Sequence, residues 1–95
     1  MVVVLARLLV KQERQADFVA RAQEVIAATR EEKGCISYTL YKSTENPLEL
    51  IYVEEWESRA DLEAHSKSEH LVKFKKDRAD MMAGESRVSV YEAVN

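Results

Sequence analysis

Two histidines and a group of aromatic and acidic side chains lie within residues 50–74, LIYVEEWESRADLEAHSKSEHLVKF. His65 can take up or release a proton, because an imidazole titrates near neutral pH. Glu54 lies beside aromatic residues, and a carboxyl group buried there must be paired or protonated. Trp56 and Tyr38 supply rings that can stack on, or hydrogen-bond to, an aromatic ligand. These residue types fit proton transfer in a pocket that excludes water.

A strand that turns directly into a helix would bring these groups together. Within residues 48–56, Tyr52, Glu54 and Trp56 share one face, because side chains along a strand alternate with period two. Ser58 follows at once and is a residue type that caps helices. We therefore expect a pocket between a sheet and the helices that cover it.

The rest of the chain supplies the other walls of this pocket. Residues 2–10 are apolar and rich in β-branched side chains, which favours a central strand covered on both faces. A helix is predicted to begin near Glu13 and to end before Gly34, a candidate for the left-handed conformation beyond a helix terminus. Its apolar residues recur at spacings of three and four: Phe18, Val19, Ala22, Val25, Ile26 and Thr29.

Three further elements complete the pattern. Residues 35–42 form a strand that pairs with residues 48–56 as a hairpin, and Ile36, Tyr38 and Leu40 share one of its faces. A helical segment opens near Ser66 or Ser68, carries an apolar stripe that includes Phe74, and is closed by Gly84. Residues 87–94 form the last strand.

The order of these elements predicts the fold class. Helices segregated from an antiparallel sheet are typical of an α+β fold of ferredoxin-like type, here one domain over residues 1–95 with four strands and the helices on one face. The other face of the sheet is too apolar to remain in water, so we expect a homodimer packed sheet to sheet. That face carries Ser37, Thr39, Tyr41, Ile51 and Val53.

Composition excludes several classes of partner. The net charge is −3, and the 17 acidic and 14 basic residues are mixed along the chain, so no basic patch marks a nucleic-acid or anionic membrane surface. The apolar opening is too short to span a bilayer and lacks a signal-peptide cleavage site. The single cysteine, Cys35, cannot form an internal disulfide and fits a reducing compartment, so the expected location is the cytoplasm.

The chain resembles the antibiotic biosynthesis monooxygenase family at Glu32–Tyr38 (EKGCISY), at Glu54–Ser58 (EEWES) and at Leu62–His70. The likeness covers nearly the whole chain, and the small quinol monooxygenases and the autoinducer-2-processing isomerase-like proteins look most similar. It implies a dimeric α+β barrel. It also implies an oxygenase activity on electron-rich phenols or hydroquinones that needs no metal, flavin or other prosthetic group.

The resemblance also implies site residues, because Tyr38, Glu54, Trp56, Ser58 and His65 match family positions and His70 matches a frequent Ser/Thr-x-His element. With the residue chemistry above, it predicts His65 and Glu54 as catalytic residues. The predicted substrate-binding residues are Trp56, Tyr38, Tyr52, His70 and Phe74.

The predicted function is a cofactor-independent monooxygenase of a quinol or phenolic aromatic, with His65 as base or oxyanion donor. The alternatives are an isomerase or tautomerase of a small hydroxy-ketone, and non-enzymatic binding of a hydrophobic metabolite. Glu54 either orients His65 or forms a structural ion pair with an arginine such as Arg7. No metal site is expected from His65, His70 and Glu69, because their spacing matches no strong ligand motif.

Overall fold

Four strands form one antiparallel sheet: β1 (Val2–Leu9), β2 (Cys35–Lys42), β3 (Glu49–Trp56) and β4 (Arg87–Glu92). Their order across the sheet is β2-β3-β1-β4, so β1 and β3 are the central strands. This computed structural model describes residues 1–94, and residue 95, the last of the predicted domain range, lies outside the described residues. The predicted α+β fold of ferredoxin-like type is confirmed.

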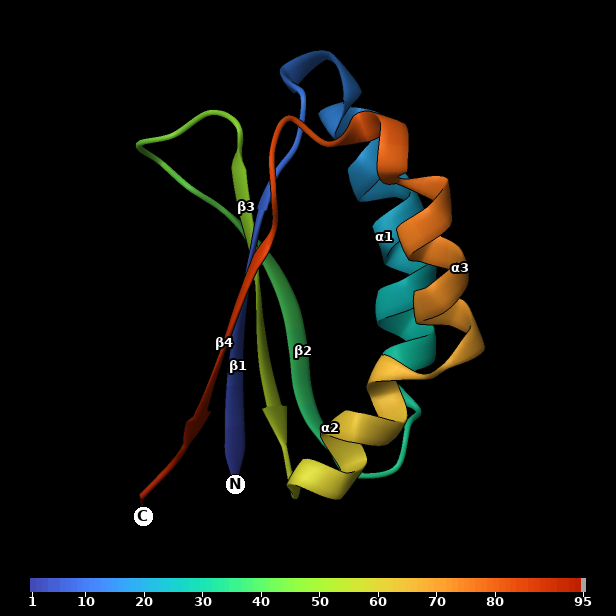
Figure 1. Ribbon diagram of the computed structural model, residues 1–95, viewed down its shortest axis with the longest axis vertical. Helices are drawn as coiled ribbons and strands as arrows, with labels where there is room; N and C mark the ends of the chain where they lie inside the picture. The colour runs from blue at the N-terminus through green and yellow to red at the C-terminus, as the bar shows by residue number, and fades with distance from the viewer. Residues whose placement is uncertain (95) are drawn as a thin grey trace.

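The helices lie on one face of this sheet, as predicted (Figure 1). They are α1 (Gln15–Arg30), α2 (Arg59–Ser66) and α3 (Glu69–Asp77), with short 3-10 turns at Gln12–Arg14 and Ala79–Met81. The prediction that the third helix continues to Gly84 is wrong, because backbone hydrogen bonds join residues 81–83 to the end of β1. Lys11 donates to the Met81 carbonyl, and Ala83 donates to the Leu9 carbonyl. The chain therefore leaves the helix after Asp77.

Helix α1 packs the predicted apolar stripe against the sheet. Phe18, Ala22, Val25, Ile26 and Thr29 are buried. Val19 is the exception at 36% exposed, because it lies on the flank of α1, beside the open edge of β2.

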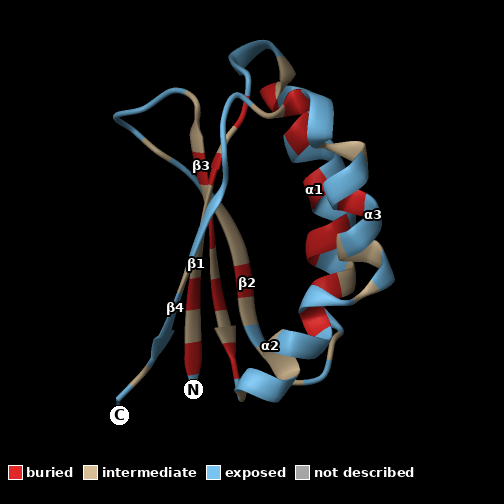
Figure 2. Cartoon of the chain, in the orientation of Figure 1, coloured by how far each residue is buried: buried red, intermediate tan, exposed pale blue. Residues whose placement is uncertain are grey.

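Strand β3 alternates between a buried and a half-buried face. Leu50, Tyr52, Glu54 and Trp56 are all buried beneath the helices, and each residue between them is half-buried (Figure 2). The predicted common face of Tyr52, Glu54 and Trp56 is confirmed. This face forms the floor on which the site is built.

Strand β2 departs from simple alternation at a β-bulge. Cys35 lies opposite Trp56 and Ser37 lies opposite Glu55, so Ile36 is an extra residue without a partner on β3. Ile36 is therefore 50% exposed, and the prediction that it shares one face of the strand with Tyr38 and Leu40 is wrong. After the bulge the alternation resumes, and Tyr38 is buried.

Gly34, in the loop between α1 and β2, has a positive φ of 82°, as predicted. A Cβ at this position would collide with the carboxylate of Asp61, in the first turn of α2. Ser58 caps that turn, because its Oγ accepts a hydrogen bond from the backbone N–H of Asp61 at 3.2 Å. The loop after α1 thus packs directly on the start of α2.

No helix or strand among residues 1–94 covers the face of the sheet away from the helices (Figure 1). Ile51 and Val53 are half-buried there, and Tyr41 and Tyr91 are more than half exposed. Among residues 1–94, no helix combines the length and apolar character needed to cross a bilayer.

Candidate active site

A cavity of about 150 Å³ lies between the inner face of the sheet and helices α2 and α3. Its apolar wall is formed by Val4, Ala6 and Leu8 of β1, Leu62 of α2, and Leu71 and Phe74 of α3. The polar and titratable groups that line it include Tyr38, Tyr52, Glu54, His65, Lys75 and Arg78. The cavity therefore combines a mostly apolar surface with a few groups able to bond a ligand or move a proton.

His65 is the central titratable group of this cavity. It comes from α2, is 3% exposed, and its Nδ1 lies 2.9 Å from Oε2 of Glu32. Since a carboxylate only accepts hydrogen bonds, Nδ1 carries the proton and Nε2 is the basic nitrogen. Within residues 1–94, no protein group bonds to Nε2.

The surroundings keep His65 neutral at pH 7. Burial lowers its pKa below the usual 6.5 and outweighs the hydrogen bond to Glu32, which raises it. Two aromatic rings fix the imidazole plane: Trp56, at 4.8 Å between ring centroids, and Tyr38, at 5.3 Å. An unprotonated, oriented imidazole is the form that can act as a general base.

Glu54 is a second buried titratable group on the cavity wall. Burial raises its pKa to about 7, and the hydrogen bond that its Oε1 accepts from Nε1 of Trp56, at 2.9 Å, offsets part of this effect. Glu54 bonds to neither of its two expected partners. The first, His65, is oriented by Glu32 instead. Arg7 pairs with Ile51 in the strand register and so points to the opposite face of the sheet.

Tyr38 and Tyr52 form an aromatic wall, with ring centroids 5.0 Å apart. Burial raises the pKa of both phenols, so both stay protonated at neutral pH and can act as hydrogen-bond donors. The hydroxyl of Tyr52 is buried and has no hydrogen-bond partner within residues 1–94.

The cavity gathers five of the seven predicted site residues: Tyr38, Tyr52, Glu54, His65 and Phe74. Trp56 is fully buried and does not line the cavity, so it acts through its contacts with His65 and Glu54. His70 lines a separate hollow between α1 and α3, and its Nε2 lies 2.7 Å from Oε2 of Glu32.

Sequence reasoning missed two residues of the site. Glu32 lies just beyond the end of α1, in a run of charged residues typical of a helix end, and no local pattern indicates its bond to His65. Arg78 follows α3 and lines the cavity, but a single arginine after a helix is common in any protein. Only the packing of α1, α2 and α3 on the sheet brings these residues into the site.

Glu32, His65 and His70 are also a set that could hold a metal ion. One ligand atom from each lies within 4.8 Å of the others, and His and carboxylate ligands suit Zn²⁺ and related ions. Both imidazoles already bond to the same carboxylate oxygen, so a metal would have to replace these two hydrogen bonds. In this structure the three side chains therefore form a hydrogen-bonded triad.

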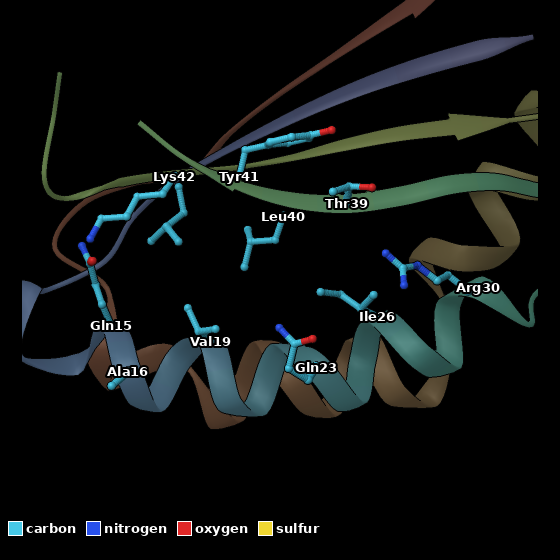
Figure 3. A pocket seen from close by; sticks show the side chains of 11 residues that line it. Gln15, Ala16, Val19, Gln23, Ile26, Arg30, Thr39, Leu40, Tyr41 and Lys42 are labelled. Carbon is cyan, nitrogen blue, oxygen red and sulfur yellow. The ribbon is translucent and has the colours of Figure 1, made fainter. Parts of the chain in front are cut away.

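A larger hollow of about 490 Å³ lies between α1 and the edge of β2 (Figure 3). Val19 and Ile26 of α1 point across it toward Leu40 of β2. Arg30 also lines this hollow. Its guanidinium donates two hydrogen bonds to the Tyr38 carbonyl, at 3.0 and 3.2 Å. None of the described residues that line it is a histidine or carries a carboxylate that could move a proton, so the smaller cavity is the candidate site.

Comparisons with known proteins agree with this fold. A family model described as antibiotic biosynthesis monooxygenase matches residues 1–77. A Mycobacterium tuberculosis protein with a provisional monooxygenase name is 30% identical over 89 residues, which cover 94% of this chain and 87% of that protein.

Two further relatives were found. An uncharacterized Synechocystis protein is 29% identical over 91 residues, which are 96% of this chain and 62% of that longer protein. A solved structure of a conserved protein from Methanosarcina mazei superposes with a TM-score of 0.90 at 30% identity and covers 95% of this chain and 89% of that chain.

Proposed function

The chain belongs to the antibiotic biosynthesis monooxygenase family, and on that premise we propose that it oxidises a small quinol or phenol with dioxygen and without a cofactor. The observation that supports this proposal is the neutral imidazole of His65, held through Nδ1 by Glu32 on the wall of a mostly apolar cavity.

The first step of the proposed reaction is removal of a hydroxyl proton by Nε2 of His65. The imidazolium that forms is stabilised by the Glu32 carboxylate 2.9 Å from Nδ1. The apolar wall keeps water from competing for the substrate anion, so the anion stays electron-rich. His65 thus supplies the base that this chemistry requires.

Dioxygen then takes one electron from the substrate anion, which leaves a semiquinone and superoxide. The two radicals combine at a ring carbon to form a hydroperoxide, and loss of water gives a hydroxyquinone. In total, one hydroquinone and one dioxygen give one hydroxyquinone and one water. One oxygen atom of dioxygen stays on the ring, and the other leaves as water with two of the substrate's hydrogen atoms. The substrate supplies every electron that reduces dioxygen, so no external reductant is needed.

The size of the cavity favours a single-ring substrate. A dry apolar cavity of about 150 Å³ in another protein binds benzene. The cavity beside His65 has a similar volume of about 150 Å³. It therefore suits a single-ring quinol better than a polycyclic phenol.

Oxygen uptake with a panel of hydroquinones tests this proposal. His65→Ala and His65→Gln are expected to lower turnover by about 10²–10⁴-fold, the usual contribution of a positioned general base. His70→Ala is the matched control, because His70 bonds to the same Glu32 oxygen but does not line the cavity. Wild-type turnover in both His65 variants, with unchanged circular dichroism, would remove His65 from the mechanism.

One observation favours an isomerase or tautomerase as the second candidate. Glu54, with a pKa of about 7, and neutral His65 line the same cavity, so one could remove a proton while the other returns one. An anaerobic assay separates the candidates, because isomerisation continues without dioxygen and oxygenation stops. Tight binding of the whole panel without turnover would instead indicate sequestration of a hydrophobic metabolite.

We also propose a homodimer packed through the uncovered face of the sheet. The support is the group of apolar side chains there, which includes Ile51, Val53 and the exposed rings of Tyr41 and Tyr91. A cytoplasmic location is a further proposal, supported by the single cysteine.

A further inference from the structure

Arg78 lines the cavity, and no acidic side chain among the described residues forms an ion pair with it. It lies at the end of α3, half-buried, with its guanidinium carbon 5.6 Å from the centroid of the Phe74 ring. No ion pair or side-chain hydrogen bond formed within residues 1–94 involves its guanidinium. A guanidinium stays charged at neutral pH, so the cavity contains a permanent cation.

A second donor on the same cavity also lacks an acceptor. The buried hydroxyl of Tyr52 has no partner among the described residues, although it lines the cavity together with Arg78. A buried polar group without a partner costs about 1–3 kcal/mol, so such groups usually have a role or an unseen ligand. Arg78 and Tyr52 are therefore unpaired donors on one small hollow, which the exposed Lys75 also lines.

Within residues 1–94, no group accepts a hydrogen bond from either donor. The face of Phe74 attracts the cation but accepts no hydrogen bond in the plane of the guanidinium. Glu54 lines the cavity too, but its Oε1 accepts from Trp56, and no ion pair joins it to Arg78. An anion with at least two acceptor oxygens could accept hydrogen bonds from both donors.

We propose that the substrate is an aromatic carboxylate whose carboxylate group is bound by Arg78 and Tyr52, with its ring in the cavity and its hydroxyl at His65. This inference rests on the proposed function and names the substrate class for it. A carboxylate fits because the planar guanidinium can form two parallel hydrogen bonds to its oxygens. The phenol of Tyr52 donates to the remaining lone pairs.

Binding under anaerobic conditions tests the subsite without turnover. Isothermal titration calorimetry compares 2,5-dihydroxybenzoate with 2,5-dihydroxybenzamide, a neutral analogue of nearly the same shape. Wild-type protein is expected to bind the acid about 10–100-fold more tightly, the range for hydrogen bonds to a charged group. Arg78→Met is expected to abolish this preference, Arg78→Lys to keep part of it, and Tyr52→Phe to reduce it.

Arg21→Met is the control for net charge, because Arg21 is exposed on α1 and does not line this cavity. It should leave the preference for the acid unchanged. Equal affinities for acid and amide in the wild type would overturn the subsite, as would a preference that persists in Arg78→Met.

Thermal unfolding distinguishes a binding role from a structural one. A cation kept for a ligand is unpaired in the free protein, so Arg78→Met should unfold at the same or a higher temperature than the wild type. 2,5-Dihydroxybenzoate should raise the unfolding temperature of the wild type more than that of Arg78→Met. A large decrease in the variant's unfolding temperature would make Arg78 structural and overturn the proposal.

The subsite and the oxygenase fail separately. Tight, Arg78-dependent binding without oxygen uptake would keep the subsite and overturn the oxygenase. Oxygen uptake with neutral hydroquinone, at the same KM in wild type and Arg78→Met, combined with equal affinity for acid and amide, would overturn the subsite and keep the oxygenase.

Discussion

Nδ1 of His65 lies 2.9 Å from Oε2 of Glu32, although 33 residues separate them in the chain. This bond orients the imidazole, fixes the proton on Nδ1 and leaves Nε2 as the base. The proposed chemistry depends on it, because a rotated or protonated imidazole could not accept a proton from a ligand in the cavity.

Replacing Glu32 tests that bond. Glu32→Gln removes the charge that raises the pKa of His65 and stabilises its imidazolium, so that pKa should decrease further. The acidic limb of the pH–rate profile should shift to lower pH, and turnover at pH 7 should fall by about tenfold or more. Glu31→Gln, an exposed neighbour, is the control. An acidic limb at the same pH in Glu32→Gln as in the wild type would contradict the pairing of Glu32 with His65.

Glu54 should make stability depend on pH. Its folded pKa of about 7 exceeds the 4.5 of a free glutamate, so the folded state binds more protons between these values and stability decreases as pH rises through this window. The loss is at most about 3 to 4 kcal/mol, since one pKa unit corresponds to about 1.4 kcal/mol.

Glu54→Gln keeps an acceptor for Nε1 of Trp56 but cannot ionise. Its stability relative to the wild type should therefore increase from pH 4.5 to pH 7 and remain higher above pH 7. Denaturant unfolding at several pH values measures this difference. His65 titrates in both proteins, so its opposite contribution cancels in the comparison. A constant difference across this range would show that Glu54 keeps an ordinary pKa.

Metal ions should inhibit rather than activate. A chelator is expected to leave wild-type turnover unchanged. Excess Zn²⁺ bound by Glu32, His65 and His70 would occupy Nδ1 of His65 and leave the proton on Nε2, which abolishes the base. His70→Ala should weaken this inhibition. Loss of turnover on chelation, restored by added metal, would instead mean that the triad binds a catalytic ion.

Gly34 should be intolerant of a side chain. Gly34→Ala should destabilise the protein by about 2–3 kcal/mol, from the strained backbone and the displaced cap at Ser58 and Asp61. Gly84→Ala is the matched control, because its Cβ would meet only the flexible end of Leu9, at 3.0 Å. Equal effects of the two substitutions in denaturant unfolding would contradict the importance of the loop contact.

The proposed dimer can be tested at the centre of the uncovered sheet face. Val53 lies between Leu5 of β1 and Thr39 of β2 in the strand register. Val53→Lys should convert a dimer into monomers in light scattering, because a charge would be buried between two sheets. Val72→Lys, at an exposed position on α3, should leave the mass unchanged. A monomeric wild type would exclude the dimer.

Local periodicity in the sequence was sufficient to predict the order of the strands and helices and one wall of the site. The alternation of β3 correctly places Tyr52 and Glu54 on the buried face, because strand geometry depends only on neighbouring residues. The cap at Ser58 correctly starts the helix that carries His65. The likeness of the chain to its family added the expectation of cofactor-independent oxygenase chemistry.

Tertiary structure alone decided the partners of these residues. The bulge at Ile36 depends on how β2 pairs with β3, and the separation of His70 from the cavity depends on how α3 packs on α1. Glu32 reaches His65 because the loop after α1 packs against the start of α2, at the contact that requires Gly34. Such contacts join residues far apart in the chain, so local sequence patterns carry no record of them, and only the packed fold determines which nitrogen of His65 is free.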